Sequence, residues 1–374
     1  MNRLSILKYD LVSIALYIGL VSFGIINIYS SSFNGSSPSL FDLSSIVGKQ
    51  VIFFFLSLVV FIFILFTRNK FFDNSASIVY FLSIILLLGL FVFGVERGGA
   101  RSWYALGPIS FQPSELAKFG TALFLSKFLS IIQTDLKRNR DILIVLIIIL
   151  VPLILTTIQP DPGSALIFLA FIFPVIREGL NLNYFYFGLY IISTLLLTLK
   201  FNFLISLAIL TIIFLTYLIY LRNKKIKVSL LKYLFSFFIL ISISFSTNYL
   251  FENVLEQRHR DRINLVLGKE IDTSGIGYNI NQSKIALSNG GFFGTGFLEG
   301  TQTKGNFVPR QHTDFIFSTI GEEWGFIGTL STIVIFSFLI IRIITRADKQ
   351  PNHFRRIYSY CFASLIFFHF FLNV

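Results

Sequence analysis

Long runs of apolar residues without a charge recur along almost the whole 374-residue chain. A hydrocarbon core of about 30 Å needs roughly 20 such residues for each helix that crosses it. The runs, read with the prolines, glycines and charges that bound them, predict an all-α, polytopic membrane helix bundle of about eleven spans. The predicted spans are 11–29, 50–66, 76–94, 114–132, 142–158, 164–177, 184–199, 203–221, 233–250, 322–343 and 357–374.

One interval, 251–313, is too polar and too rich in glycine to cross a membrane. We expect it to form a long loop outside the membrane, within a single integral membrane domain that covers residues 1–374. It is the one sizeable region outside the predicted spans. Function is therefore expected where this loop meets the ends of the spans.

The lysines and arginines predict which ends of the spans face the cytoplasm. With a cytoplasmic N-terminus, eighteen of them fall in inside segments and four in short outside loops. Membrane proteins keep positive charge on the inside, and long translocated loops are exempt from this rule. The pattern predicts a cytoplasmic N-terminus, with 222–232 and 342–356 cytoplasmic and 251–313 outside.

Composition narrows the functional classes. Charged residues make up 13% of the chain, whereas soluble domains have about a quarter. A net charge of +12 would suggest nucleic acid in a soluble protein, but topology explains it here, so no nucleic-acid partner is expected. A single cysteine and four histidines without an HExxH pair argue against a disulfide framework and a Cys- or His-ligated metal centre.

The first of four polar features is the segment 101–118, RSWYALGPISFQPSELAK. Pro113 suits the first turn of a helix, and Glu115 favours its positive end. Glu115 and Lys118 are three residues apart, so they share a face and can pair. Charged residues inside a membrane usually face a bundle interior or an aqueous cavity. The alternative is an ion pair with a structural role alone.

The second feature is QPDPG at 159–163, a tight break between two spans. Asp161 either lines the same polar region as Glu115 and Lys118 or acts as the N-cap of the following helix.

The third feature is the charged segment 258–272 in the long loop. Mixed charges beside a bilayer suit a lipid pyrophosphate and a proton acceptor. They suit an ordinary solvated surface equally well.

The fourth feature is the glycine-dense stretch from Gly277 to Glu323. Glycine permits a positive φ and a close backbone approach to a ligand. The spacing does not match a P-loop, and a loop that needs tight turns is the alternative.

In this order, the four features resemble the SEDS family, which includes RodA, FtsW and SpoVE. RSWYALGPISFQPSELAK is similar to the family's RW…FQPSELAK, and QPDPG to its QPDLG. GYNINQSKIALSNGGFFGTGFLEGTQT and HTDFIFSTIGEEWGF resemble the family's GAGY…QSxIAIGSGG…GKG…GTQ…HTDFIF…EE.G block. RodA is the closer fit, through GTQT and HTDFIF.

The resemblance implies a peptidoglycan glycosyltransferase of the bacterial inner membrane that polymerises lipid II into glycan strands, for cell elongation and shape or for cell division. It also implies a class B penicillin-binding transpeptidase as partner. Two alternatives stay open: a flippase or transporter of the lipid-linked precursor, and a non-catalytic scaffold of the elongation machinery.

The resemblance also assigns roles to residues. A carboxylate base is needed near the attacking hydroxyl, and cationic groups, or a divalent cation such as Mg²⁺ or Mn²⁺, are needed at the pyrophosphate. By analogy Glu115, Lys118 and Asp161 line the central cavity. The pyrophosphate contacts are Arg258, Arg260 and Arg262, and the further matched positions are Arg101, Gln282, Ser283 and His312.

The chain departs from the family pattern at the base itself. The family's proposed catalytic aspartate falls on Gly268, which cannot accept a proton. Asp272 coincides with a second family acid and is the predicted base. Glu270 is the nearest alternative, and Asp261 is another.

Three further departures concern the rest of the chain. Arg310 stands where the family has glutamate. The spans within 184–221 exceed the usual arrangement, and the match ends at Val374, short of the family's last span.

Overall fold

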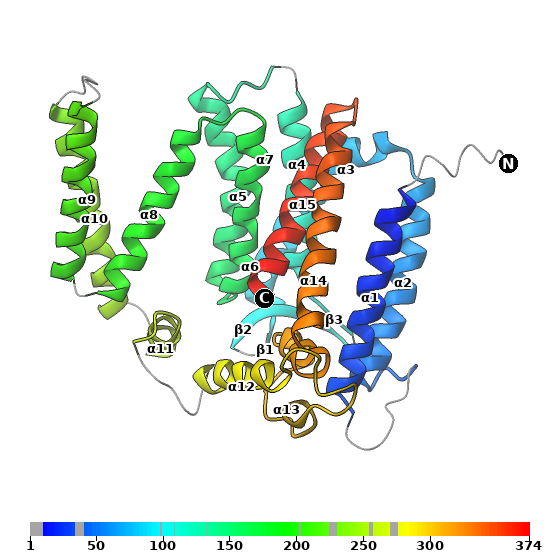
Figure 1. Ribbon diagram of the computed structural model, residues 1–374. Coiled ribbons are helices and arrows are strands. Elements are labelled where there is room, and N and C mark those ends of the chain that lie inside the picture. The colour runs from blue at the N-terminus through cyan, green and yellow to red at the C-terminus, as the bar shows by residue number, and fades with distance from the viewer. Residues whose placement is uncertain are drawn as a thin grey trace. The chain divides into compact units, whose positions relative to one another are not determined.

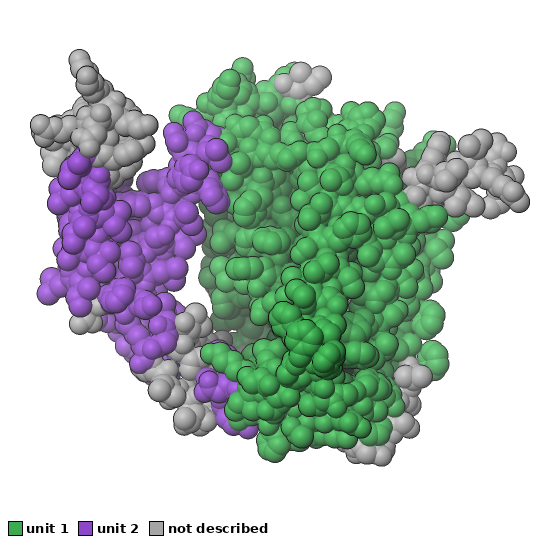
Figure 2. All heavy atoms as spheres, in the orientation of Figure 1, with its two compact units in different colours: residues 1–180, 282–374 green, residues 181–281 purple. Residues whose placement is uncertain are grey.

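The computed structural model describes residues 10–33, 41–97, 99–107, 109–131, 133–201, 203–223, 230–253, 257–269 and 276–374. The described chain is helical almost throughout (Figure 1). It divides into two compact units, Met1–Leu180 with Gln282–Val374, and Asn181–Asn281 (Figure 2).

The first unit contains most of the helices. They are α1 (Leu11–Ser31), α2 (Ile46–Phe66), α3 (Asn69–Phe93), α4 (Pro113–Ser130), α5 (Asn139–Ile158), α6 (Pro162–Ile167), α7 (Ile172–Arg177), α13 (Thr301–Lys304), α14 (Ile316–Asp348) and α15 (His353–Asn373). A 3₁₀ turn, η2 (Phe168–Phe171), joins α6 to α7.

The second unit contains α8 (Leu182–Lys200), α9 (Phe203–Asn223), α10 (Leu230–Asn253) and α11 (Gln257–Val266). Helix α12 (Ile276–Asn289) crosses the boundary between the units. Inside this unit, the hydroxyls of Thr198 and Ser244 lie 2.9 Å apart and join α8 to α10.

The predicted all-α fold is confirmed, because each of the eleven predicted spans coincides with a helix or, at 164–177, with the series α6–η2–α7. Six described helices are long and apolar enough to cross a membrane: α1, α2, α3, α5, α8 and α14. The interval 251–313, expected to be a loop, contains α11, α12 and α13.

Helix α4 packs against α3, α5 and α15. Its small residues make this possible, since a Cβ on Gly120 would lie 3.2 Å from the Cα of Tyr80 in α3. The surrounding apolar core includes the fully buried Leu90, Leu125 and Ile357. Polar side chains on α4 are therefore held inside the bundle.

A small antiparallel sheet precedes α4, and sequence analysis did not predict it. Its strands are β1 (Val95–Arg97), β2 (Ala100–Leu106) and β3 (Ile109–Phe111), in the order β1–β2–β3. The Tyr104 hydroxyl donates to the carbonyl of Leu86 in α3 at 2.9 Å. Gly89 leaves room for it, because a Cβ there would lie 2.4 Å from the hydroxyl. This contact fixes where the chain enters α4.

Helix α14 is broken at Gly325, whose φ of 64° and ψ of −161° are not helical. In a continuous α-helix the amides of Phe326 and Ile327 would donate to the carbonyls of Glu322 and Glu323. The break separates these two pairs. Four backbone groups, two of them on the buried Glu322 and Glu323, consequently need other partners.

The loop 290–296, called the clamp loop below, provides those partners. It accepts from both amides and donates to both carbonyls, so it replaces the two missing helical hydrogen bonds with four bonds of its own. These bonds run from Thr295 N to Glu322 O (2.9 Å), Gly296 N to Glu323 O (3.1 Å), Phe326 N to Gly291 O (2.9 Å) and Ile327 N to Phe292 O (3.3 Å).

Glycines allow this approach of two backbones. A Cβ on Gly290 would lie 1.8 Å from the carbonyl oxygen of Gly321, and one on Gly325 would lie 2.3 Å from the amide nitrogen of Gly294. Atoms at such distances collide. The glycine density that suggested a ligand cradle therefore serves backbone-to-backbone packing in this segment.

Glu322 ties α13 to the same place. Its fully buried carboxylate accepts from the amides of Gln302 and Thr303, both at 2.8 Å, and from the Thr303 hydroxyl at 2.7 Å. The neighbouring Glu323 accepts from Ser30 at the end of α1. Buried carboxylates with this many donors act as structural anchors.

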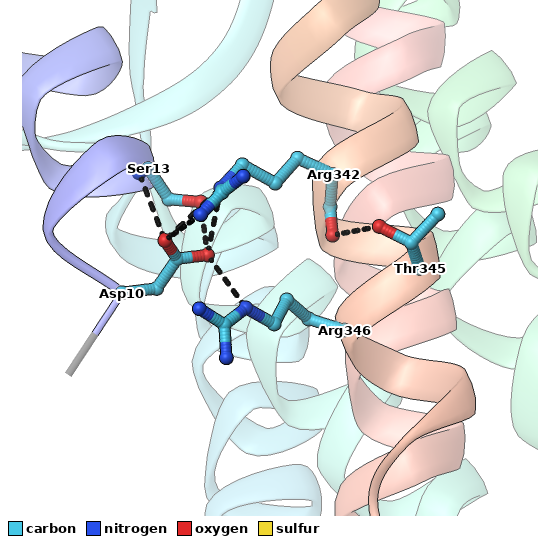
Figure 3. A network of polar contacts seen from close by, with 5 residues as sticks. All are labelled: Asp10, Ser13, Arg342, Thr345 and Arg346. Atoms are coloured by element: carbon cyan, nitrogen blue, oxygen red, sulfur yellow. Dashed lines mark hydrogen bonds and ion pairs between the residues drawn. The ribbon is translucent and has the colours of Figure 1, made fainter. Parts of the chain in front are cut away.

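Charged side chains hold the C-terminal end of α14. Asp10, the N-cap of α1, accepts from Arg342 at 2.6 Å and from Arg346 at 3.1 Å (Figure 3). Burial opposes ionisation of Asp10, but the hydrogen bonds from Arg342 and Ser13 outweigh it and hold the pKa of this carboxyl below its usual range. The network connects the start of α1 to the end of α14.

Replacing Asp10 with Asn should lower the free energy of unfolding by about 2 kcal/mol, because a neutral amide loses the charge-assisted bonds to both arginines. A lowered folded-state pKa means that the stabilisation is fully present above the unfolded-state pKa of about 3.9 and is lost as the pH falls through the folded-state value. Thermal unfolding in detergent should therefore separate wild type from variant at neutral pH and less so in acid. Asp314→Asn is the control, since its ion pair with Arg310 is exposed and 3.5 Å long. Equal losses in both variants would contradict the argument.

Replacing Gly290 with Ala should destabilise the protein by about 1–3 kcal/mol or prevent folding, because the added methyl would push the clamp loop away from α14. Gly19→Ala in α1 is the matched control: a Cβ there meets nothing within 4 Å, and alanine favours the helix by about 0.5–1 kcal/mol. The measurement is the unfolding temperature of each purified variant. A Gly290→Ala protein as stable as Gly19→Ala would show that the clamp loop can move freely.

Candidate functional site

Lys118 is the one lysine or arginine that is buried among the described residues, with 3% of the residue exposed. It lies in the second turn of α4, and its Nζ is 2.6 Å from Oε1 of Glu115. The ion pair predicted from the three-residue spacing is present. The same Nζ lies 3.0 Å from Nε2 of His369, near the end of α15.

Asp161 joins the start of α6 to the start of α4. Its Oδ1 accepts from the amide of Ser164 at 3.1 Å, so of the two alternatives for Asp161 the N-cap role is present. Its Oδ2 accepts from Nε2 of Gln112, the residue directly before α4, at 2.9 Å. Asp161 also attracts Lys118 electrostatically.

These five side chains are called the polar cluster below: Gln112, Glu115, Lys118, Asp161 and His369. Glu115 and Lys118 differ in solvent exposure. The Glu115 side chain is 55% exposed, whereas that of Lys118 is 4% exposed. The cluster therefore presents a reachable carboxylate backed by a buried cation, and this arrangement can orient a polar group that enters from the exposed side.

Two members of the cluster were missed by sequence analysis. Gln112 lies inside the FQPSELAK motif but was given no role. His369 interrupts the run Phe367–Phe371, and a polar residue among phenylalanines in a predicted span is a signal that could have found it.

The other candidates of the first unit lie apart from the cluster's hydrogen bonds. Arg101 is exposed, and its Nη1 donates to the carbonyl of Phe91 at 3.3 Å, which ties β2 to α3. Gln282 and Ser283 are half-buried in α12, and His312 is half-buried before α14. Among the described residues, none of these four side chains is hydrogen-bonded to the polar cluster.

The charged candidates of the long interval belong to the second unit. Arg260 donates to the carbonyl of Glu252 at 3.1 Å, and the exposed Asp261 accepts from Gln257 at 2.8 Å. The side chains of Arg258 and Arg262 lie outside the described residues. The predicted bases Asp272 and Glu270 lie outside them as well.

Gly268 ends α11. It has a φ of 71°, and the amide of Lys269 donates to the carbonyl of Asn264 at 2.9 Å, which is the bond of a Schellman motif. A left-handed residue at this position favours glycine. Gly268, the residue that the sequence analysis set against the family's aspartate, therefore has a conformational role.

The described part of the chain offers few side chains that could together ligate a metal ion. It contains no group of three or more His, Cys, Asp or Glu side chains that could hold a metal ion.

Comparison with known proteins places the chain. The model of the cell cycle protein family FtsW/RodA/SpoVE matches residues 10–205 and 181–374. The peptidoglycan glycosyltransferase MrdB of Escherichia coli K12 is 29% identical over 81% of this chain and 68% of its own length. The peptidoglycan glycosyltransferase RodA of Treponema pallidum is 27% identical over 98% of this chain and 88% of its own.

Solved structures share the fold. A chain of a peptidoglycan synthase complex, described as coordinating polymerisation and crosslinking, has a TM-score of 0.69 at 23% identity and covers 98% of this chain and 86% of its own. RodA of Thermus thermophilus has a TM-score of 0.57 at 23% identity, over 96% of this chain and 81% of its own. The resemblance seen in the sequence is confirmed: this chain is a multi-pass bacterial membrane protein and belongs to the family of cell cycle proteins that includes FtsW, RodA and SpoVE.

Proposed function

We propose that this protein is a peptidoglycan glycosyltransferase that polymerises lipid II into glycan strands. Its family and the names of its relatives support this function. The observation that carries it is the polar cluster, in which a buried Lys118 is paired with a half-exposed Glu115 beside Asp161. Charges inside a membrane bundle are expensive to maintain and mark functional sites.

The reaction transfers a glycan from one undecaprenyl-pyrophosphate carrier to the sugar hydroxyl of another. The hydroxyl oxygen bonds to the anomeric carbon, and the bond from that carbon to the pyrophosphate breaks. The hydroxyl proton passes to a carboxylate, and undecaprenyl pyrophosphate leaves. We assign the base to Asp272, with Glu270 and Asp261 as alternatives, because position 268 is glycine.

The leaving pyrophosphate needs positive charge. Arg258, Arg260 and Arg262 supply it at one turn of α11, alone or with a bound Mg²⁺ or Mn²⁺. Glu115, Lys118 and Asp161 orient the glycan. The protein lies in the inner membrane with its N-terminus in the cytoplasm, and it works with a class B penicillin-binding transpeptidase.

One observation favours a second function, that of a non-catalytic scaffold. Gly268, where the sequence resemblance puts the family's aspartate, has the Schellman geometry that ends a helix, and this supports a scaffold. A scaffold would keep the fold and the transpeptidase contact while lacking polymerase activity. The polymerisation assay separates the two.

Purified protein in complex with its transpeptidase should polymerise lipid II, and Lys118→Ala should lower the rate at least about 100-fold, since it leaves the Glu115 carboxylate without its partner. Asp272→Ala should lower it by about 10²–10⁴-fold, the usual contribution of a general base. Glycan products are measured by gel electrophoresis. Lys349→Ala, at an exposed lysine after α14, should keep full activity.

The outcomes are distinct. A wild-type complex without activity favours the scaffold. Activity that survives Asp272→Ala but is lost in Glu270→Ala or Asp261→Ala moves the base to that residue.

The orientation is tested by cysteine labelling with a membrane-impermeant thiol reagent. A cysteine in place of the exposed Lys304 should be labelled from outside, and one in place of the exposed Lys349 should be spared, because 251–313 is outside and 342–356 is cytoplasmic. The native Cys361 is fully buried. It is replaced by serine, so that the introduced cysteine is the one thiol in each variant. The reverse labelling pattern would invert the topology.

A further inference from the structure

The contact between His369 and Lys118 goes beyond the residues that the family pattern marks. His369 Nε2 lies 3.0 Å from Lys118 Nζ. Glu115, the lysine's other hydrogen-bond partner, is on the same helix as Lys118. Among the described residues, His369 is thus the one hydrogen-bond partner that reaches this ammonium from another element.

The chemistry of the two groups fixes the direction of the bond. A protonated lysine has three N–H donors and no acceptor. With Lys118 charged against Glu115, the Nε2 of His369 must accept, so the ring is neutral and its proton is on Nδ1. The histidine thereby adds an acceptor without adding a second positive charge.

Lys118 needs this second acceptor to hold one position. Its side chain is a flexible four-carbon stem, and a single partner one turn away on the same helix restrains it weakly. The Glu115 side chain is also half exposed, so few neighbouring side chains restrain it. Two acceptors from two helices, in contrast, define where the ammonium lies.

His369 is itself held firmly. The Asn373 side chain donates to its backbone carbonyl at 2.8 Å. The adjacent Phe370 stacks on Phe336 of α14 with ring centroids 4.5 Å apart. The acceptor therefore belongs to α15, and α14 helps to place it.

We propose that His369 is a positioning residue of this site: it holds the Lys118 ammonium against Glu115, so that the pair meets the anionic substrate in one fixed arrangement. The role in catalysis rests on the proposed function, whereas the holding of Lys118 does not.

Three substitutions of His369 test whether the acceptor must lie at the place of Nε2 or whether any polar side chain suffices. The side-chain amide of Gln reaches the place of Nε2, that of Asn reaches only the place of Nδ1, and Phe keeps the ring without an acceptor. His369→Gln should retain kcat within about 3-fold, whereas His369→Asn and His369→Phe should lose about 10- to 100-fold in kcat, the effect of a misplaced group. KM for lipid II should change less than kcat in both.

A second readout does not need polymerase activity. Acylation of Lys118 by a small amine-reactive ester, followed by mass spectrometry of the folded protein in detergent, should be faster in His369→Asn and His369→Phe than in wild type and His369→Gln. His353→Asn is the control, because this histidine lies at the opposite end of α15 and contacts Arg356. It should change neither readout.

The two readouts distinguish a failure of the proposed function from a failure of the role proposed for His369. If wild type does not polymerise lipid II, the proposed function fails, and the acylation rates alone decide whether His369 holds Lys118. If His369→Asn does not fold, as judged by its unfolding temperature, the comparison of His369→Gln with His369→Phe decides. Equal acylation of Lys118 in wild type, His369→Gln and the acceptor-free variants overturns the proposal. Equal kcat in active His369→Gln and His369→Phe also overturns it.

Discussion

Near its start, α14 lacks two of the backbone hydrogen bonds that a continuous helix would make. The arrangement of the neighbouring segments depends on how this loss is made good. The break at Gly325 removes the two bonds, and the clamp loop 290–296 provides four replacements. A backbone group that loses its partner away from water costs free energy, and departure of the loop would unpair all four groups. The glycines that mark this stretch follow from that constraint, because a Cβ at Gly290 or Gly325 would collide with the partner backbone. Glu322 extends the constraint to α13 through its buried carboxylate.

The two ends of α14 are fixed by different physics. At Glu322 the bonds are buried and involve backbone amides, so dissolved salt has little access to them. At Arg342 and Arg346 the bonds join side chains that solvent reaches, with 25% and 52% of the arginine side chains exposed. Their strength depends on the ionised state of Asp10. The helix is thus anchored by buried hydrogen bonds at one end and by partly exposed ion pairs at the other.

The sequence predicted the features that depend on residues close together in the chain, and it missed those that depend on residues far apart. Spans could be predicted because run length and charge are local, and the pair of Glu115 and Lys118 because helical spacing is local. Asp161 as an N-cap is local as well. The sheet before α4 was missed because its docking depends on Tyr104 meeting a distant carbonyl.

The same reasoning explains the two larger omissions. The glycines of the clamp loop were assigned to turns or a ligand, since nothing local shows that the partner is a helix some thirty residues away. His369 was missed because its partner, Lys118, is 251 positions earlier in the chain. Tertiary contacts of this kind are specified by packing, which a single sequence does not display.

Packing also connects the clamp to the polar cluster. The clamp loop and the Asp10 network determine where α14 lies, and Phe336 of α14 stacks on Phe370 of α15. Phe370 is adjacent to His369, whose ring reaches Lys118 on α4. The position of a buried ammonium thus depends on a helix that it does not touch. Because a protein interior is close-packed and transmits displacement, the glycines of the clamp loop contribute to the geometry of the site although no hydrogen bond joins the described part of that loop to the cluster.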